Sequence, residues 1–252
     1  MRSPSPAKES KTIFDELTQC LYSDGILTEM QFFRYIKDIH ALKDSQVEDC
    51  LLAFANAAYG RKSEAINFFE LAIDKTKNVL IAENYVTYFE TIGSFQDLSQ
   101  LSLRMADAFE YKSLAKKAFS LSMLNGRIDL AKEYFAKCLK LCSDDEREVV
   151  RMEMSLMLEG ATLFKERVGF TDDEFISFSE IVMRTFDAYN QKCSYAVYKL
   201  INEGPINNYT LSVDSDDVEV IADMNLSVAM AFAEHDEFLG KNFSVWFLGK
   251  DD

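Results

Sequence analysis

Two histidines are the first residues to consider for acid–base or nucleophilic chemistry in this 252-residue chain. His235 lies in the run Glu234-His235-Asp236-Glu237, where neighbouring carboxylates could orient an imidazole that activates a nucleophile. The sequence places no serine or cysteine beside it, and contains neither a glycine-rich phosphate loop nor a nucleophile elbow. His40 has no second ligand candidate nearby, so we interpret it as a structural residue. The sequence therefore predicts no catalytic residue and no cofactor.

Two groups of residues have the composition of metal ligands. Cys138 and Cys142 are four residues apart on one face of a predicted helix, but a zinc site needs two further ligands, which no Cys or His pair supplies. We interpret both thiols as small buried hydrophobic side chains. The run from Asp214 to Glu219 resembles the opening of a calcium loop, yet the required glycine and closing glutamate are not at their spacing. We interpret it as the solvated start of a helix, so no metal site is predicted.

The distribution of charge is more informative than any single residue. The chain has a net charge of −15. Residues 1–143 contain 18 Lys and Arg against 19 Asp and Glu, whereas residues 144–252 contain 9 against 23, so the second part has a net charge of −14. Such a field could attract a basic protein partner and would repel nucleic acid, or it could serve only to keep the protein in solution.

The candidate partner-binding residues are carboxylates at the two ends of one predicted helix, over 216–234. We expect them to face solvent and to bind cationic side chains of a partner. Nucleic acid is not expected as a partner, because basic clusters with interleaved aromatic residues are absent. A membrane is not expected either, because no apolar run approaches membrane-spanning length. The candidates are Asp214, Asp216, Asp217, Glu219, Glu234, Asp236 and Glu237.

The elements that must position these residues begin with regularly spaced glycines. Gly60, Gly93 and Gly126 are separated by 33 residues each, and each lies between two apolar runs with helical periodicity. A fixed spacing in this range is typical of helical repeats, in which paired helices stack and share a core. Further helices are predicted over 13–22, 29–42, 45–58, 63–76 and 144–168.

The region from 45 to 143 resembles the tetratricopeptide repeat family. In the first repeat, the family's small residues, turn glycine and aromatic residue match Ala53, Gly60, Ala65, Phe69 and Ala72. In the third, they match Gly126, Ala131 and Phe135, with Cys138 in place of the last alanine. The middle repeat keeps Gly93 but has Leu98, Ser102 and Met105 at the later positions, and the family's early Trp and closing Pro are absent throughout. The resemblance implies a superhelical scaffold of helix pairs that binds another protein and has no chemistry of its own.

The pattern changes after residue 203. Strands are predicted over 208–213 and 243–248, joined by the helix over 216–234 and preceded by a helix over 172–202, with a break near 190–193 as the alternative. This order favours two parallel strands joined by a crossover, and an antiparallel return is the alternative. Two strands make a marginal sheet, so helices or a strand of another chain must support it. The predicted buried face of the joining helix is Val218, Ile221, Ala222, Leu226, Ala229, Phe232 and Ala233.

These observations define the predicted fold and domains. The fold class is mainly α, with a tetratricopeptide-like α-α superhelical repeat followed by a small α/β C-terminal region with two strands. We expect a disordered tail over 1–11, a helical repeat domain over 12–168 and an acidic α/β region over 169–252.

The predicted function is non-catalytic binding of a basic protein. The most specific form is a cytoplasmic immunity protein or antitoxin that neutralises a basic, nuclease-like toxin, because such toxins must bind phosphates. Alternatives are a chaperone or adaptor that holds a peptide in the repeat groove, and an enzyme or ligand sensor whose site lies in the C-terminal region. The odd number of cysteines and the lack of a secretory signal indicate a reducing compartment.

Overall fold

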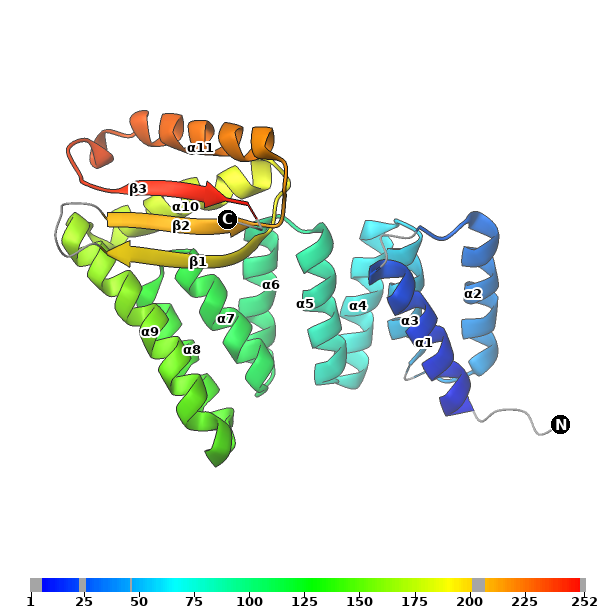
Figure 1. The fold of residues 1–252 in the computed structure, drawn as a ribbon. Helices are drawn as coiled ribbons and strands as arrows, with labels where there is room; N and C mark the ends of the chain where they lie inside the picture. Colours follow the sequence, from blue (N-terminus) through cyan, green and yellow to red (C-terminus); the bar gives the residue numbers. More distant parts are fainter. Residues whose placement is uncertain (1–5, 23–25, 46, 201–206, 250–252) are drawn as a thin grey trace. The chain divides into compact units, whose positions relative to one another are not determined.

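The computed structural model describes residues 6–22, 26–45, 47–200 and 207–249 (Figure 1). The chain forms two compact units, Met1–Ile92 and Gly93–Asp252, and each is described by itself. The described residues are mainly helical with a small sheet near the C-terminus, which confirms the mainly α fold class. The predicted domain boundary after residue 168 falls inside the second unit. None of the described helices is both long and apolar enough to cross a membrane.

The described part of the first unit consists of helices. They are α1 (Pro6–Tyr22), α2 (Glu29–Leu42), α3 (Glu48–Ala58), α4 (Lys62–Thr76) and α5 (Val79–Ile92). α1 begins at Pro6, a residue suited to the first turn of a helix, so residues 6–11 are helical where the sequence predicts a disordered tail. Residues 1–5 of that predicted tail lie outside the described residues. Leu17, Ile39 and Phe69 are fully buried in the core of this unit.

The second unit combines helices with the sheet. Its helices are α6 (Phe95–Ala108), α7 (Lys112–Leu124), α8 (Ile128–Leu141), α9 (Asp144–Val168), α10 (Asp172–Ala188), α11 (Val218–Ala233) and the short 3-10 helix η1 (Asp236–Phe238). Its strands are β1 (Cys193–Leu200), β2 (Asn207–Val213) and β3 (Ser244–Leu248). A threonine followed three residues later by a glutamate, as in Thr171-Asp172-Asp173-Glu174, predicts a capping box at a helix start. The structure confirms it at the start of α10, where Thr171 and Glu174 exchange side-chain-to-backbone hydrogen bonds.

Two helix hairpins, α3–α4 and α7–α8, are joined by turns with the same geometry. Gly60 and Gly126 have φ values of 86° and 70°. At both turns the glycine N–H donates to the carbonyl three residues earlier at 3.0 Å, and the next N–H donates to the carbonyl five residues earlier at 2.9 Å. Glycine suits these positions because it adopts positive φ without steric strain. Both turns lie where the glycine spacing predicts them.

Gly93 does not form the third equivalent turn that the spacing predicts. Its φ is outside the positive range found at Gly60 and Gly126. The reason is local: Ser94 is the N-cap of α6, and its hydroxyl accepts a hydrogen bond from the Asp97 N–H at 3.1 Å. Helix α6 therefore begins without a left-handed residue before it.

The sheet has the order β1-β2-β3. β2 and β3 coincide closely with the two predicted strands and run parallel, which confirms a crossover through α11. β1 is a third strand, antiparallel to β2, where the sequence predicts the end of a long helix. That helix ends at Ala188 because Asn190 adopts a left-handed conformation with φ of 50°, after which exposed and half-buried side chains alternate from Tyr195 to Lys199.

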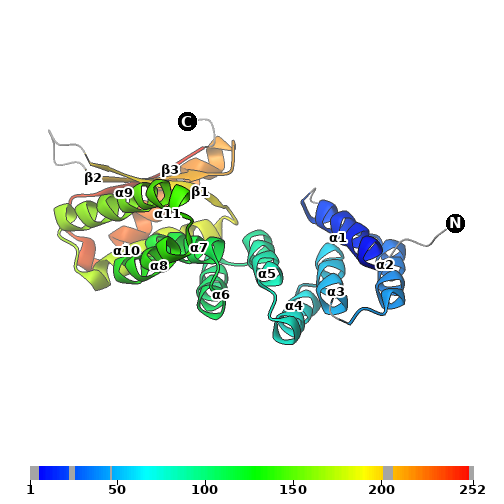
Figure 2. The ribbon, with the colours of Figure 1, turned by 90° about the horizontal axis from the view of Figure 1, so that it is seen from below.

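Helices α9 and α10 lie on one face of the sheet (Figure 2). Aromatic side chains fill the space between these helices and the strands. Phe164 of α9 lies 5.1 Å from the Tyr198 ring and Phe178 of α10 lies 5.7 Å from the Tyr209 ring, both measured between centroids. Phe164, Phe178 and Tyr209 are almost completely buried. This core holds the strands on the helices, so the small sheet does not need to be stable alone.

Candidate protein-binding surface

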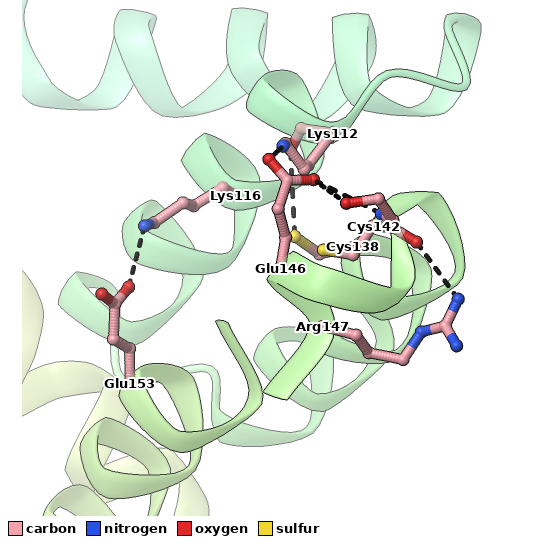
Figure 3. Close-up of polar contacts among 8 residues, drawn as sticks. Lys112, Lys116, Cys138, Cys142, Glu146, Arg147 and Glu153 are labelled. Carbon is pink, nitrogen blue, oxygen red and sulfur yellow. Dashed lines mark hydrogen bonds and ion pairs between the residues drawn. The ribbon is translucent and has the colours of Figure 1, made fainter. Parts of the chain in front are cut away.

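The cysteine pair is placed at the junction of α7, α8 and the start of α9 (Figure 3). Cys138 and Cys142 are both buried, and the Cys138 thiol lies 3.9 Å from the Lys112 carbonyl oxygen. Burial raises the pKa of the Cys138 thiol to about 11, so it is protonated at neutral pH. Within the described residues there is no group of three or more His, Cys, Asp or Glu that could hold a metal ion. The arrangement is that of packed thiols rather than of ligands.

The two histidines each contact a carboxylate. His235 Nδ1 lies 3.1 Å from Glu237 Oε1, and the imidazole is partly exposed. His40 Nδ1 lies 2.8 Å from Glu48 Oε1. Neither imidazole has a described hydrogen bond to a serine or cysteine, so neither belongs to a described nucleophile–base pair.

The segment that resembles a calcium loop forms the cap of α11. Asp217 is the N-cap residue, and its Oδ1 accepts hydrogen bonds from the N–H groups of Glu219 at 3.0 Å and Val220 at 3.3 Å. Ser215 Oγ accepts from the Asp217 N–H at 3.2 Å. These carboxylate and hydroxyl oxygens therefore satisfy backbone donors at the start of the helix.

Four of the seven acidic residues of α9 pair with nearby cations. Lys112 and Lys116 of α7 pair with Glu146 at 2.6 Å and Glu153 at 3.0 Å (Figure 3). Hydrogen bonds from Lys112 and Ser143 lower the pKa of Glu146 to about 2. Two further carboxylates of α9 pair with Arg on the same helix, Asp144 with Arg147 and Glu148 with Arg151, and Lys165 of α9 pairs with Asp172 at the start of α10. These carboxylates are therefore already neutralised by cations of the same unit.

The acidic residues around α11 are arranged differently. Asp216, Asp217 and Glu219 are exposed at its start, and Glu234, Asp236 and Glu237 are exposed at its end. Asp214, also exposed, donates its backbone N–H to the Lys192 carbonyl at 3.2 Å. A helix of 16 residues is about 24 Å long, so the two predicted groups are separated by roughly that distance.

Few charges in the described chain compensate these carboxylates. Within ion-pair distance of Asp216, Asp217, Glu219, Asp223, Glu234 and Asp236, the described residues supply no Lys or Arg. Glu237 pairs only with the partly exposed His235 among them. The two ends of α11 therefore carry exposed carboxylates that no described Lys or Arg compensates.

The apolar surface of α11 corrects the sequence prediction. Val218, Leu226 and Met230 are 77%, 61% and 59% exposed, and Ala222, Ala229 and Ala233 on the same stripe are exposed too. The predicted buried face included Val218, Ala222, Leu226, Ala229 and Ala233, so this part of the prediction is wrong. The helix buries Met224 and Val228 instead.

The reason is the position of α11 at the edge of the sheet, beyond β3 (Figure 1). The Asn225 side chain accepts from the Phe247 N–H at 2.8 Å and donates to the Phe247 carbonyl at 3.0 Å. This contact turns the face with Asn225 towards the sheet. The sequence did indicate a second apolar face, because α11 has apolar residues almost all round its circumference and a single buried face cannot include them all. The sequence prediction assigned all of them to one core.

Comparisons with family models, curated proteins and solved structures found no match for this chain.

Proposed function

We propose that this protein is a non-catalytic binding protein, and that the outward face of α11 with its acidic ends binds a basic protein partner. The carrying observation is the exposed apolar stripe of Val218, Leu226 and Met230. Burying a large apolar side chain contributes about 1.5–3 kcal/mol, so three such residues give a partner a substantial binding surface. An exposed apolar patch rimmed by polar residues is typical of a protein-interaction site.

The acidic ends favour a basic partner over other classes. Asp216, Asp217, Glu219, Glu234 and Asp236 have no Lys or Arg within ion-pair distance in the described part of the chain. Their field steers cationic surfaces towards α11 and repels nucleic acid and anionic lipid. A partner with an apolar strip between two groups of Lys or Arg, separated by roughly the 24 Å length of this helix, would match the arrangement. An immunity protein or antitoxin that neutralises a basic, nuclease-like toxin is the most specific form of this proposal.

The helix pairs support a scaffold role. The shared turns at Gly60 and Gly126, with the buried Ala65 and Ala131 after them, support a tetratricopeptide-like interpretation of both hairpins. A cytoplasmic location is part of the proposal, supported by the absence of disulfides among the five cysteines, all of which lie in the described residues. A peptide-holding groove over 45–143 stays a prediction, because its residues belong to both units.

The test compares two triple variants with the same charge change at the start of a helix. Asp216→Asn, Asp217→Asn and Glu219→Gln neutralise the start of α11, and Asn can still cap the helix. The matched control is Asp144→Asn, Asp145→Asn and Glu148→Gln at the start of α9. The partner is captured from the native host at low salt by wild-type protein and identified, and its association rate is then measured with each variant.

We expect the α11 variant to slow association several-fold, whereas the α9 control stays close to wild type. The rate with wild-type protein should fall steeply with salt, because the Debye length shrinks from about 10 Å at 0.1 M to about 3 Å at 1 M. Leu226→Asp should raise the dissociation rate by placing a charge in the apolar stripe. A partner that ignores all these changes would show that α11 is not the binding surface.

A further inference from the structure

The two edges of the sheet differ in whether the backbone N–H and C=O groups that face outwards have hydrogen-bond partners. At the β3 edge, the Asn225 side chain pairs with both backbone groups of Phe247, as a neighbouring strand would. At the β1 edge, the segment from Tyr195 to Lys199 has no described backbone–backbone hydrogen bond outside its ladder with β2. An uncovered strand edge is a template for the addition of another strand.

An apolar groove of about 560 Å³ runs beside this edge. One wall is formed by α7 and α9, which contribute Leu124, Leu156 and Met157. The other includes four consecutive residues of β1, Tyr195–Tyr198, although their side chains alternate between the two faces of the sheet. Tyr209 of β2, the register partner of Tyr198, lines it too, so the groove extends from β1, an edge strand, onto the adjoining face of the sheet. The groove therefore offers backbone groups on one side and apolar side chains on the other.

The charged side chains along β1 beside the groove are basic. Lys117 is the one charged residue among the described residues that line it. Lys192 immediately precedes β1 and Lys199 lies near its end, and both side chains are exposed. Neither Lys192 nor Lys199 has a carboxylate within ion-pair distance among the described residues. A ligand that carries acidic residues beside an apolar stretch would be complementary.

We propose that this groove binds an extended, apolar and acidic peptide segment of another protein, which adds to the sheet as a fourth strand beside β1. Its backbone pairs with the β1 edge, and alternate side chains enter the apolar groove. Its acidic residues lie near Lys192 and Lys199. The site is at the sheet edge opposite to α11, so it goes beyond the proposed α11 surface and can be occupied together with it (Figure 1).

The probe is a peptide selected from a random library, which requires no assumption about the natural partner. A phage-displayed library of random ten-residue peptides is selected on the full-length protein, and the consensus is synthesised with a fluorescent label. We expect the consensus to alternate apolar residues and to contain Asp or Glu. Its affinity is then measured by fluorescence anisotropy with wild-type protein and with two variants of α9.

The variants differ in whether the substituted residue lines the groove. Met157→Lys places a charge in the groove, and we expect it to weaken binding at least ten-fold. Met152→Lys makes the same change at another exposed position of α9 that does not line the groove, and should leave the affinity unchanged. The α11 triple variant should also leave it unchanged, which separates this proposal from the proposed function.

A second experiment tests whether the peptide backbone pairs with the β1 edge. Two versions of the peptide carry N-methyl groups on alternate amides, one on odd and one on even positions. Strand addition requires that one version lose binding while the other keeps it, because alternate N–H groups of an added strand face β1. Equal binding of both versions, equal effects of the two methionine variants, or failure to select any consensus would overturn the proposal. Sedimentation that showed wild-type dimers, abolished by Met157→Lys, would also overturn it by assigning the edge to a second copy.

Discussion

The hairpins α3–α4 and α7–α8 have the same turn but different surroundings. At Gly60, a Cβ atom would meet no heavy atom within 4 Å. At Gly126, the same atom would lie 2.5 Å from the Phe175 carbonyl oxygen and 2.6 Å from Ser179 Oγ, because α10 packs directly on this turn. Gly60 and Gly126 look equivalent in the sequence, but only the Gly60 position has room for a side chain. The local sequence determines the geometry of each turn, and the elements packed on the turn determine whether it has room for a side chain.

The ion pairs differ in the same way. In the first hairpin, Lys75 of α4 pairs with Asp49 of α3 at 2.9 Å, so the pair joins the two helices of the hairpin itself. In the second, Lys112 and Lys116 of α7 pair with residues of α9. The second hairpin is joined to α9 and α10 through its charges and its turn, whereas the first also contacts α2, through the pair of Glu48 with His40 and the Arg61 side chain over the Phe32 ring.

Replacement of the two turn glycines by alanine should give the largest difference in stability between the two hairpins. Gly126→Ala combines a left-handed residue, which costs about 1–2 kcal/mol, with overpacking against α10, which costs about 1–3 kcal/mol. Gly60→Ala has only the first cost. Hydrogen-exchange mass spectrometry should show strongly reduced protection in α7, α8 and α10 for Gly126→Ala, and a smaller effect in α3 and α4 for Gly60→Ala. Equal effects would contradict the difference in surroundings.

Replacement of the alanines after each turn tests what the hairpins share. Ala65 and Ala131 are both fully buried, and their N–H groups donate to the carbonyls of Arg61 and Arg127 at 3.0 and 2.9 Å. We expect Ala65→Leu and Ala131→Leu each to cost about 1–3 kcal/mol through overpacking. Ala136→Leu on the exposed side of α8 is the control and should be close to neutral. Thermal unfolding that left both buried variants unchanged would argue against close helix contact at these sites.

The smallest predicted effect concerns acid stability. Because Lys112 and Ser143 lower the pKa of Glu146 from 4.5 to about 2, its ionised form stabilises the fold above about pH 4.5, and this contribution is lost as the pH falls towards 2. Glu146→Gln should flatten the pH dependence of unfolding in that window. Glu148→Gln, whose partner Arg151 is on the same helix, is the matched control. An unchanged pH profile for Glu146→Gln would show that the contact with α7 adds no stability.

The sequence predicted the local features of the fold well. The turns at Gly60 and Gly126, the capping box of Thr171 and Glu174, and the parallel strands around α11 depend on short-range chemistry that residue types reveal. Strand β1 was missed because its residues continue a helical apolar pattern, and the left-handed Asn190 that ends α10 is not visible in periodicity. For the candidate surface, the acidic positions were predicted from charge alone, but the apolar stripe between them was assigned to the core.

By itself, the sequence determined the helical class, the places where helices begin and turn, and the concentration of acidic residues near the C-terminus, because propensity, capping and net charge are properties of neighbouring residues. Only the tertiary structure decided which face of α11 is buried, since that depends on Asn225 reaching Phe247 from 22 residues away. It also decided that Glu146 and Glu153 of α9 pair with lysines of α7. Asp216, Asp217 and Glu219, by contrast, have no Lys or Arg within ion-pair distance among the described residues. Burial and charge compensation are relations between distant segments, and packing alone determines which segments meet.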